Sequence, residues 1–206
     1  SKNRTVLFDA IEAHDIQTIQ ALILRGIDIF NPDSEGNTPL MHACAHGNNH
    51  TVQVIMRFLM LSDAPDLGLN FQNLKLESPL SLLLESNSSD NFLTSKLMIL
   101  RNGADIENIR NDSLETPLMI ACRRGQYADV ELLLRHGADI NAMDRSGNNV
   151  VYHAIEGNNV EILRILKDKG ISFKKRYGYN YKHLLNAIDK ENPEIIREIL
   201  ESGETG

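Results

Sequence analysis

The sequence predicts an all-α solenoid, in which antiparallel helix pairs stack side by side and short β-turn fingers project from the stack. Three observations lead to this fold class. A helix–turn–helix pattern occupies residues 115–141, partial copies of it recur through most of the chain, and several copies follow one another at the same interval. A single short helix pair cannot bury its own apolar faces, so such a unit requires neighbours, and repetition supplies them.

Residues 115–141 show the pattern of the unit most completely. Thr116 is a typical N-cap residue, and Pro117 suits the first turn of a helix, where its missing N–H costs nothing. Gly125 predicts the end of this first helix. A second apolar stretch predicts a second helix, which ends at Gly137. Two short antiparallel helices are therefore expected in each copy.

The copies align on the position of Thr116. The equivalent residues are Thr5, Thr38, Ser78, Thr116, Asn149 and Lys182. The first, fourth and fifth intervals between these residues are equal, whereas the second and third intervals are longer. We therefore expect residues 1–206 to form one continuous domain of six repeats. Their approximate bounds are 1–30, 31–70, 71–108, 109–141, 142–174 and 175–206.

The second and third repeats are longer and predict insertions. In the second repeat we expect the additional residues to extend the second helix, which Pro65 then ends, and the loop that follows it. In the third repeat the polar residues 86–91 predict an irregular loop between the two helices. In the fifth repeat Asn149 replaces threonine, and we expect its first helix to be less well capped.

Composition and charge disfavour two classes of partner. The chain is 42% hydrophobic and 24% charged, which is typical of soluble globular proteins. Its net charge of −7 and pI near 5.5 disfavour general affinity for nucleic acid or an anionic membrane. The longest apolar run, near Val54–Leu61, is interrupted by Arg57 and is too short to span a bilayer. We expect neither a membrane helix nor general nucleic-acid binding.

The sequence offers no support for catalysis, a cofactor or a metal site. It contains no Gly-rich phosphate loop, HExxH, CxxC or nucleophile elbow, and its seven histidines are scattered. We expect His42 and His153 to hydrogen bond to neighbouring fingers. Cys44 and Cys122 stand at matching places two repeats apart, which predicts a separation of roughly 20 Å between sulfurs and excludes a disulfide. We expect both to behave as small hydrophobic residues.

The recurrent spacing of about 33 residues, TPLMHACAHG at 38–47, TPLMIACRRG at 116–125 and GADIN at 137–141 resemble ankyrin repeats. The resemblance covers nearly the whole chain. It implies a non-catalytic protein–protein interaction module that binds a partner protein on its concave surface. We expect this module to be the targeting or substrate-selecting part of a larger protein, monomeric and cytoplasmic.

The resemblance also implies which residues bind the partner, because finger tips and the exposed face of the first helices form the concave surface in this family. The predicted partner-binding residues are Leu74, Lys75, Glu115, Arg123, Arg124, Arg145, Asn148, Tyr177, Tyr179 and Tyr181. We expect Arg123 and Arg124 to face Arg145, forming a cation cluster that could receive carboxylate or phosphate groups. The alternative is an ordinary solvated surface. The tyrosines lie in the basic stretch 174–183 and suit protein contact, packing on the last helix pair or stacking on bases.

Two departures from the common family pattern and two further resemblances carry expectations. Leu74 and Leu114 stand at finger positions where polar residues or glycine are usual, and Leu114 predicts a strained or reshaped turn. Asn141 lies in LLRHGADIN, which resembles the target of the asparaginyl hydroxylase that acts on ankyrin repeats, so we expect a hydroxylation site there. The Ile- and Asn-rich composition with irregular insertions resembles ankyrin proteins that intracellular bacteria deliver into the host cytoplasm.

Two other functions stay open at this point. The chain could be the substrate-recognition segment of an enzyme whose catalytic domain lies outside these residues. It could also bind nucleic acid through residues 174–183, in which case affinity would fall steeply with salt because phosphate contacts release counterions.

Overall fold

The computed structural model describes residues 2–46, 48–86, 92–107, 113–171 and 185–204. Apart from isolated bridge residues, namely Glu115 and the Met143–Asn149 pair, the regular elements of this part of the chain are helices, which confirms the all-α prediction. No helix among the described residues is long and apolar enough to cross a membrane. The chain divides into two compact units, Ser1–Asn111 and Asp112–Gly206. That the six repeats form one continuous domain stays a prediction.

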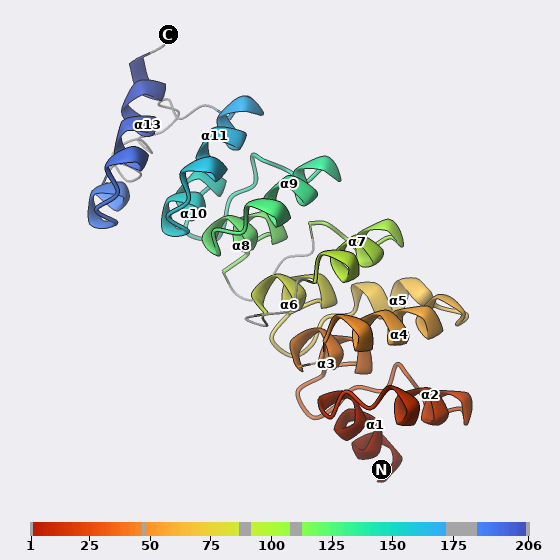
Figure 1. Cartoon of the computed structure of the whole chain (residues 1–206). Coiled ribbons are helices and arrows are strands. Elements are labelled where there is room, and N and C mark those ends of the chain that lie inside the picture. Colours follow the sequence, from red (N-terminus) through yellow and green to blue (C-terminus); the bar gives the residue numbers. More distant parts are fainter. Residues whose placement is uncertain (1, 47, 87–91, 108–112, 172–184, 205–206) are drawn as a thin grey trace. The chain divides into compact units, whose positions relative to one another are not determined.

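The described residues of the first unit form three helix pairs and one additional helix. Its helices are α1 (Lys2–Glu12), α2 (Ile16–Leu24), α3 (Pro39–His46), α4 (Asn49–Met60), α5 (Pro65–Asn70), α6 (Pro79–Glu85) and α7 (Leu93–Arg101). The first helices α1, α3 and α6 pack in succession, and so do the second helices α2, α4 and α7 (Figure 1). Between the two rows lie fully buried side chains such as Ile19, Met41 and Ile55. Each pair therefore buries its apolar faces against its neighbours.

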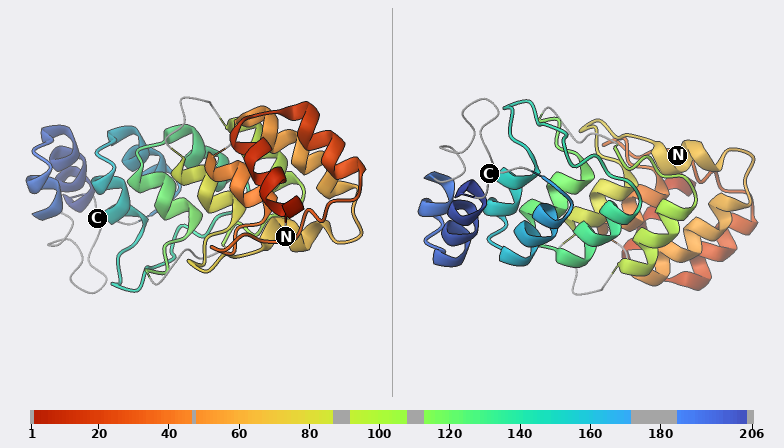
Figure 2. Two further views of the ribbon diagram at one scale, coloured as in Figure 1. Left: turned by 90° about the horizontal axis from the view of Figure 1, so that it is seen from below. Right: turned by 90° about the horizontal axis from the view of Figure 1, so that it is seen from above.

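The second unit repeats this arrangement. Its helices are α8 (Pro117–Arg123), α9 (Tyr127–Arg135), α10 (Val150–Glu156), α11 (Val160–Asp168) and α13 (Pro193–Glu204), and residues 185–189 are also helical. Helix α8 packs on α10, α9 packs on α11, and α11 packs on α13. In each unit the described parts of the links between repeats, which contain the fingers, run along one side of the helices (Figure 2).

The most complete repeat folds as its sequence indicates. The Thr116 hydroxyl accepts a hydrogen bond from the Met119 N–H at 3.4 Å, and Pro117 is the first residue of α8. Gly125 and Gly137 follow α8 and α9 with φ angles of 66° and 88°. Glycine has no Cβ, so it adopts these left-handed conformations at little steric cost, and each glycine ends its helix.

The prediction for the insertion of the second repeat is partly wrong. Helix α4 is indeed long, with 12 residues, but it ends at Met60, and Pro65 begins a separate helix, α5. Proline is favourable at the first position of a helix, so Pro65 begins α5 and does not end α4. Gly68 allows α5 to lie close to α4, since a Cβ at Gly68 would come within 2.5 Å of a Leu59 methyl carbon.

The prediction of a poorly capped helix in the fifth repeat is wrong. The side-chain oxygen of Asn149 accepts hydrogen bonds from the N–H groups of Val151 and Tyr152 at 3.1 and 3.2 Å. Asparagine caps a helix as well as threonine does. The strained turn expected at Leu114 is confirmed by its φ of 56°. The loop expected at residues 86–91 lies outside the described residues except for Ser86.

Candidate functional site

The candidate site starts from the fingers between repeats, here named finger two (residues 33–38), finger three (73–78) and finger five (144–149). In each finger one side-chain oxygen of the first residue accepts the backbone N–H groups two and four positions further along, at 2.7–2.9 Å. These first residues are Asp33, Asn73 and Asp144. Because these bonds close each turn through one residue, the side chains at the tip are not needed to hold it.

Backbone hydrogen bonds join neighbouring fingers in the same way in both units. The Leu74 N–H donates to the Glu35 carbonyl oxygen at 3.2 Å, and the Arg145 N–H donates to the Ser113 carbonyl oxygen at 2.8 Å. Leu74 and Arg145 therefore occupy equivalent backbone positions. Both side chains are exposed, so the same scaffold presents an apolar group in one unit and a cation in the other.

Lys75 and Arg124 are also accessible. The Lys75 ammonium lies 3.2 Å from a carboxylate oxygen of Glu35, and both side chains are well exposed. An ion pair of this kind contributes little to stability, so Lys75 can exchange this partner for another. Arg124 is the C-cap residue of α8 and is partly exposed.

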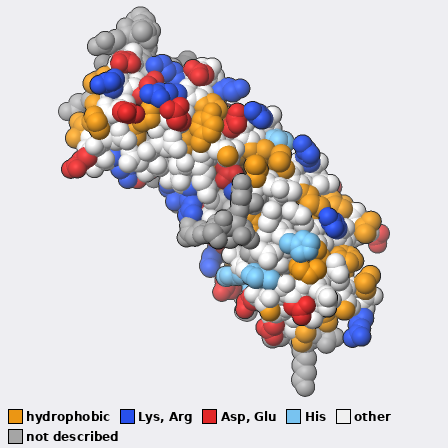
Figure 3. All heavy atoms as spheres, in the orientation of Figure 1, with side chains coloured by type: hydrophobic (Ala, Val, Ile, Leu, Met, Phe, Trp, Pro, Cys, Tyr) orange, Lys and Arg blue, Asp and Glu red, His pale blue; other side chains and the backbone are white. Residues whose placement is uncertain are grey.

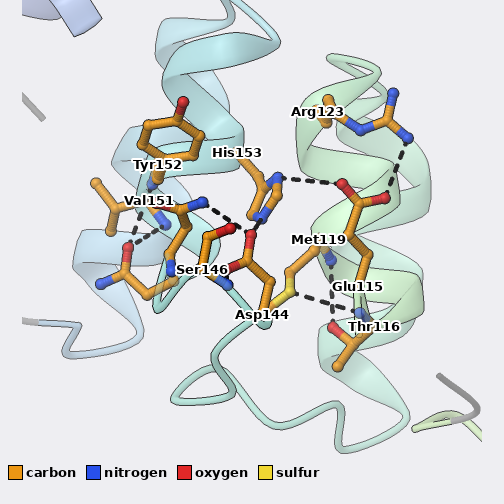
Figure 4. Close-up of polar contacts among 11 residues, drawn as sticks. Glu115, Thr116, Met119, Arg123, Asp144, Ser146, Val151, Tyr152 and His153 are labelled. Atoms are coloured by element: carbon orange, nitrogen blue, oxygen red, sulfur yellow. Dashed lines mark hydrogen bonds and ion pairs between the residues drawn. The ribbon is translucent and has the colours of Figure 1, made fainter. Parts of the chain in front are cut away.

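Three predicted binding residues are held within the protein. Arg123 and Glu115 form an ion pair, with Nη2 3.4 Å from Oε2, and Glu115 is largely buried (Figure 4). Asn148 is only 8% exposed, and its amide donates to Asp144 at 2.8 Å. Tertiary packing therefore turns Asn148 and Glu115 inward, and their contact with a partner stays a prediction. Arg123 already has a carboxylate of its own, so the predicted cation cluster is weaker than the sequence indicates.

His153 lies at the centre of the second unit's polar contacts. Its Nε2 lies 3.2 Å from Asp144 Oδ2 in finger five, and its Nδ1 lies 3.9 Å from Glu115 Oε1 (Figure 4). Burial lowers the pKa of His153 below its usual value, although the carboxylates of Glu115 and Asp144 act in the opposite direction. Burial raises the pKa of Asp144, but hydrogen bonds from Asn148 and the nearby His153 outweigh it and lower the pKa overall.

His42 has a similar place in the first unit. Its Nε2 lies 3.0 Å from Glu12 Oε1, and its Nδ1 lies 3.7 Å from Asp33 Oδ2 in finger two. Burial, together with the neighbouring His46, lowers its pKa. Histidine side chains gather on one face of the first unit, over α3 and α4 (Figure 3). The prediction of a hydrogen bond to a finger is confirmed for His153, which bonds to Asp144. It is wrong for His42, whose hydrogen bond goes to Glu12 of α1, while Asp33 of finger two lies only at ion-pair distance.

The cysteines and the remaining polar clusters give no sign of chemistry. Cys44 and Cys122 are free, fully buried thiols, and burial raises the pKa of each well above its usual value. A thiol that stays protonated is a poor nucleophile. Within the described ranges, no group of three or more His, Cys, Asp or Glu side chains is arranged to hold a metal ion.

The structure does not test two of the predictions about sites. Tyr177, Tyr179 and Tyr181 lie outside the described residues. Asn141 is exposed, and its backbone N–H donates to Asp139 Oδ1 at 2.8 Å; whether it is modified stays a prediction.

Leu76 is an exposed finger residue that the sequence analysis did not single out. It has a φ of 61° and stands in finger three where fingers two and five have Gly36 and Gly147. The alignment of the fingers already contained this signal, since Leu76 follows Asn73 at the same interval that separates Gly36 from Asp33 and Gly147 from Asp144.

Comparison with known proteins agrees with this architecture. A family model described as ankyrin repeats in three copies matches residues 55–144 and 80–177, and a model of ankyrin repeats in many copies matches residues 7–56. The ARF GTPase-activating protein Git of Drosophila melanogaster is 37% identical over 93 residues, covering 45% of this chain and 13% of that protein. The B-cell lymphoma 3 protein homolog of Mus musculus is 24% identical over 179 residues, covering 87% of this chain and 38% of that protein.

An ankyrin repeat protein of Fowlpox virus is 26% identical over 240 residues, covering 98% of this chain and 34% of that protein. The chain thus spans well under half the length of each of these relatives. Ankyrin repeats are generally protein–protein interaction modules. The family models together match residues 7–177, which is most of the chain, so this chain belongs to the ankyrin repeat family.

Proposed function

We propose that this chain is a non-catalytic module that binds a partner protein on the concave surface formed by its fingers and first helices. The observation that carries the proposal is the exposure of Leu74, Lys75 and Arg145 on turns that are closed by other residues. Since the fold does not require these side chains, they are available for recognition.

Rigid turns favour binding because little conformational freedom is lost when the partner docks. Arg145, with Arg124 from the end of α8, would receive carboxylates, for which the planar guanidinium is well suited. Leu74 would supply an apolar contact. Tyr177, Tyr179 and Tyr181 are added to this surface from the sequence alone.

The module is proposed to select a target for a larger protein. All three relatives described above extend far beyond the matched region, and one of them is an ARF GTPase-activating protein. These lengths support a recognition segment that serves other domains in the same chain. The cytoplasm is the proposed location, and a monomer is the proposed state.

The test is to identify a partner by affinity capture and then measure its affinity by calorimetry with purified variants. Arg145→Glu should weaken binding at least about ten-fold, since reversing a charge at an interface anchor costs more than about 1.4 kcal/mol. Arg135→Ala is the matched control, because Arg135 is an exposed arginine on the second-helix row, paired with Glu131. If Arg135→Ala weakens binding and Arg145→Glu does not, the partner occupies the second helices and the proposal is wrong.

A further inference from the structure

The tip of finger three carries two exposed leucines that are not part of the protein's core. Leu74 is 79% exposed and Leu76 is 45% exposed, with Lys75 between them. The equivalent of Leu74 in finger five is Arg145, and the equivalent of Leu76 is Gly147. The repeat architecture therefore does not demand leucine at either position.

Leu76 also adopts an unfavourable backbone conformation. Its φ of 61° lies in the left-handed region, where the Cβ of a non-glycine residue crowds the following carbonyl oxygen. Glycine would relieve this strain, as Gly36 does in finger two with a φ of 82°. Strained backbone residues cluster at ligand clamps and other functional sites, so strain together with an exposed apolar side chain favours a contact with another molecule.

The tip is firmly supported. The Leu76 N–H donates to the Asn73 carbonyl oxygen at 3.0 Å, and the Asn73 amide donates to the Asn37 side chain in finger two at 2.8 Å. Leu74 also lies directly over Gly36, since a Cβ there would come within 3.2 Å of the Leu74 Cγ. Fingers two and three thus form one rigid surface.

The charges on this surface indicate the chemistry of its partner. The charged residues of fingers two and three are Asp33, Glu35, Lys75 and Glu77, three carboxylates against one ammonium. Their sum of −2 makes fingers two and three acidic overall. An apolar group with adjacent positive charge would complement it, whereas an acidic segment would be repelled.

We propose that Leu74 and Leu76 of finger three form a docking site for a partner segment in which an aliphatic side chain stands next to lysine or arginine. This inference rests on the proposed function and specifies the ligand of one part of that surface. Finger three of the first unit would thus bind a positively charged segment, whereas Arg145 of the second unit would bind carboxylates.

The experiment uses a random-peptide phage library selected on the whole chain. The most enriched peptide is synthesised, and its affinity is measured by fluorescence anisotropy with the parent, Leu74→Ser and Leu76→Gly. Leu24→Ser is the matched control, because Leu24 is a 77% exposed leucine at the end of α2, away from the fingers.

Enriched peptides should combine an aliphatic residue with lysine or arginine, and both finger variants should weaken binding at least about ten-fold. Leu24→Ser should leave affinity unchanged. The melting temperature of Leu76→Gly should be no lower than that of the parent, because the left-handed strain is gone; loss of binding would then not reflect loss of folding.

Three outcomes overturn the inference. If the enriched peptides are acidic and depend on Arg145 alone, this docking site is absent while the proposed concave surface stands. If they depend on Leu24 and on neither finger, both the docking site and the concave surface are wrong. If no peptide is enriched on the parent, finger three has no affinity for short apolar and basic segments.

Discussion

At the scale of single residues, the protonation state of His153 matters, because its ring on α10 contacts Asp144 in finger five and Glu115 just before α8. Its ring is 3% exposed and lies between Asp144 and Glu115. Hydrogen bonding through Nε2 leaves Nδ1 as the unprotonated nitrogen of a neutral ring. The lowered pKa has burial as its main cause, and His42 shows the same behaviour in the first unit.

These two pKa values predict how stability depends on pH. A base whose pKa is lower in the folded state than its unfolded value of 6.5 binds fewer protons when folded. Its contribution to stability is therefore complete above about pH 6.5 and is lost as the pH falls toward the folded pKa. The melting temperature should fall from pH 7 to pH 5 (about the span where histidine titrates), and less so in a His42→Gln/His153→Gln double variant. An equal fall in parent and variant would show that other groups control this range.

Asn141 is the second prediction at this scale. Its exposure makes the side chain accessible to an asparaginyl hydroxylase, and we propose that it is modified. Incubation with the hydroxylase should add one oxygen atom to Asn141, as detected by mass spectrometry of peptides. The buried Asn148 is an internal control that should stay unmodified. Absence of oxidised Asn141 would reject the proposal.

At the scale of elements, helix α8 and the end of α10 approach each other so closely that no side chain fits at Gly157. A Cβ on Gly157 would overlap the carbonyl oxygen of Cys122 and crowd the backbone nitrogen of Gly125. The φ of Gly157 is −72°, an ordinary value, so only the packing of the two helices requires glycine here.

Gly157→Ala should therefore destabilise the second unit by about 2–3 kcal/mol, the usual cost of overpacking a tight contact. Gly137→Ala is the comparison: its φ is 88°, but no atom lies within 4 Å of the added Cβ. That variant should lose only about 1 kcal/mol, from backbone strain. Denaturant unfolding measures both, and equal losses would mean that the contact between α8 and α10 adapts.

The elements were predictable from the sequence where local chemistry defines them. Thr116 and Pro117 begin a helix, and Gly125 ends it, through interactions within a few residues. Pro65 was misread because proline is compatible with both the end and the beginning of a helix. The inward positions of Asn148 and Glu115 depend on neighbouring repeats, and no local pattern contains that information.

At the scale of the whole molecule, stability is the sum of contacts between neighbouring repeats. Leu133 is fully buried in α9, so Leu133→Ala should cost about 2–5 kcal/mol through lost burial and the remaining cavity. Arg145→Ala should change stability by no more than about 0.5 kcal/mol. Thermal unfolding of the two variants measures this difference, and a large loss in Arg145→Ala would mean that the finger tip supports the fold.

The closure of each finger by its first residue has a consequence for how this protein can change over time. Because Asp33, Asn73 and Asp144 hold their turns through backbone N–H groups, a mutation at an exposed tip position such as 74 or 145 should have little effect on folding. A lineage can therefore acquire a new target by altering one tip, while the inherited scaffold and the other tips continue to work. For the same reason, Leu74 and Arg145, which occupy equivalent backbone positions, could be exchanged between fingers three and five without disturbing either turn.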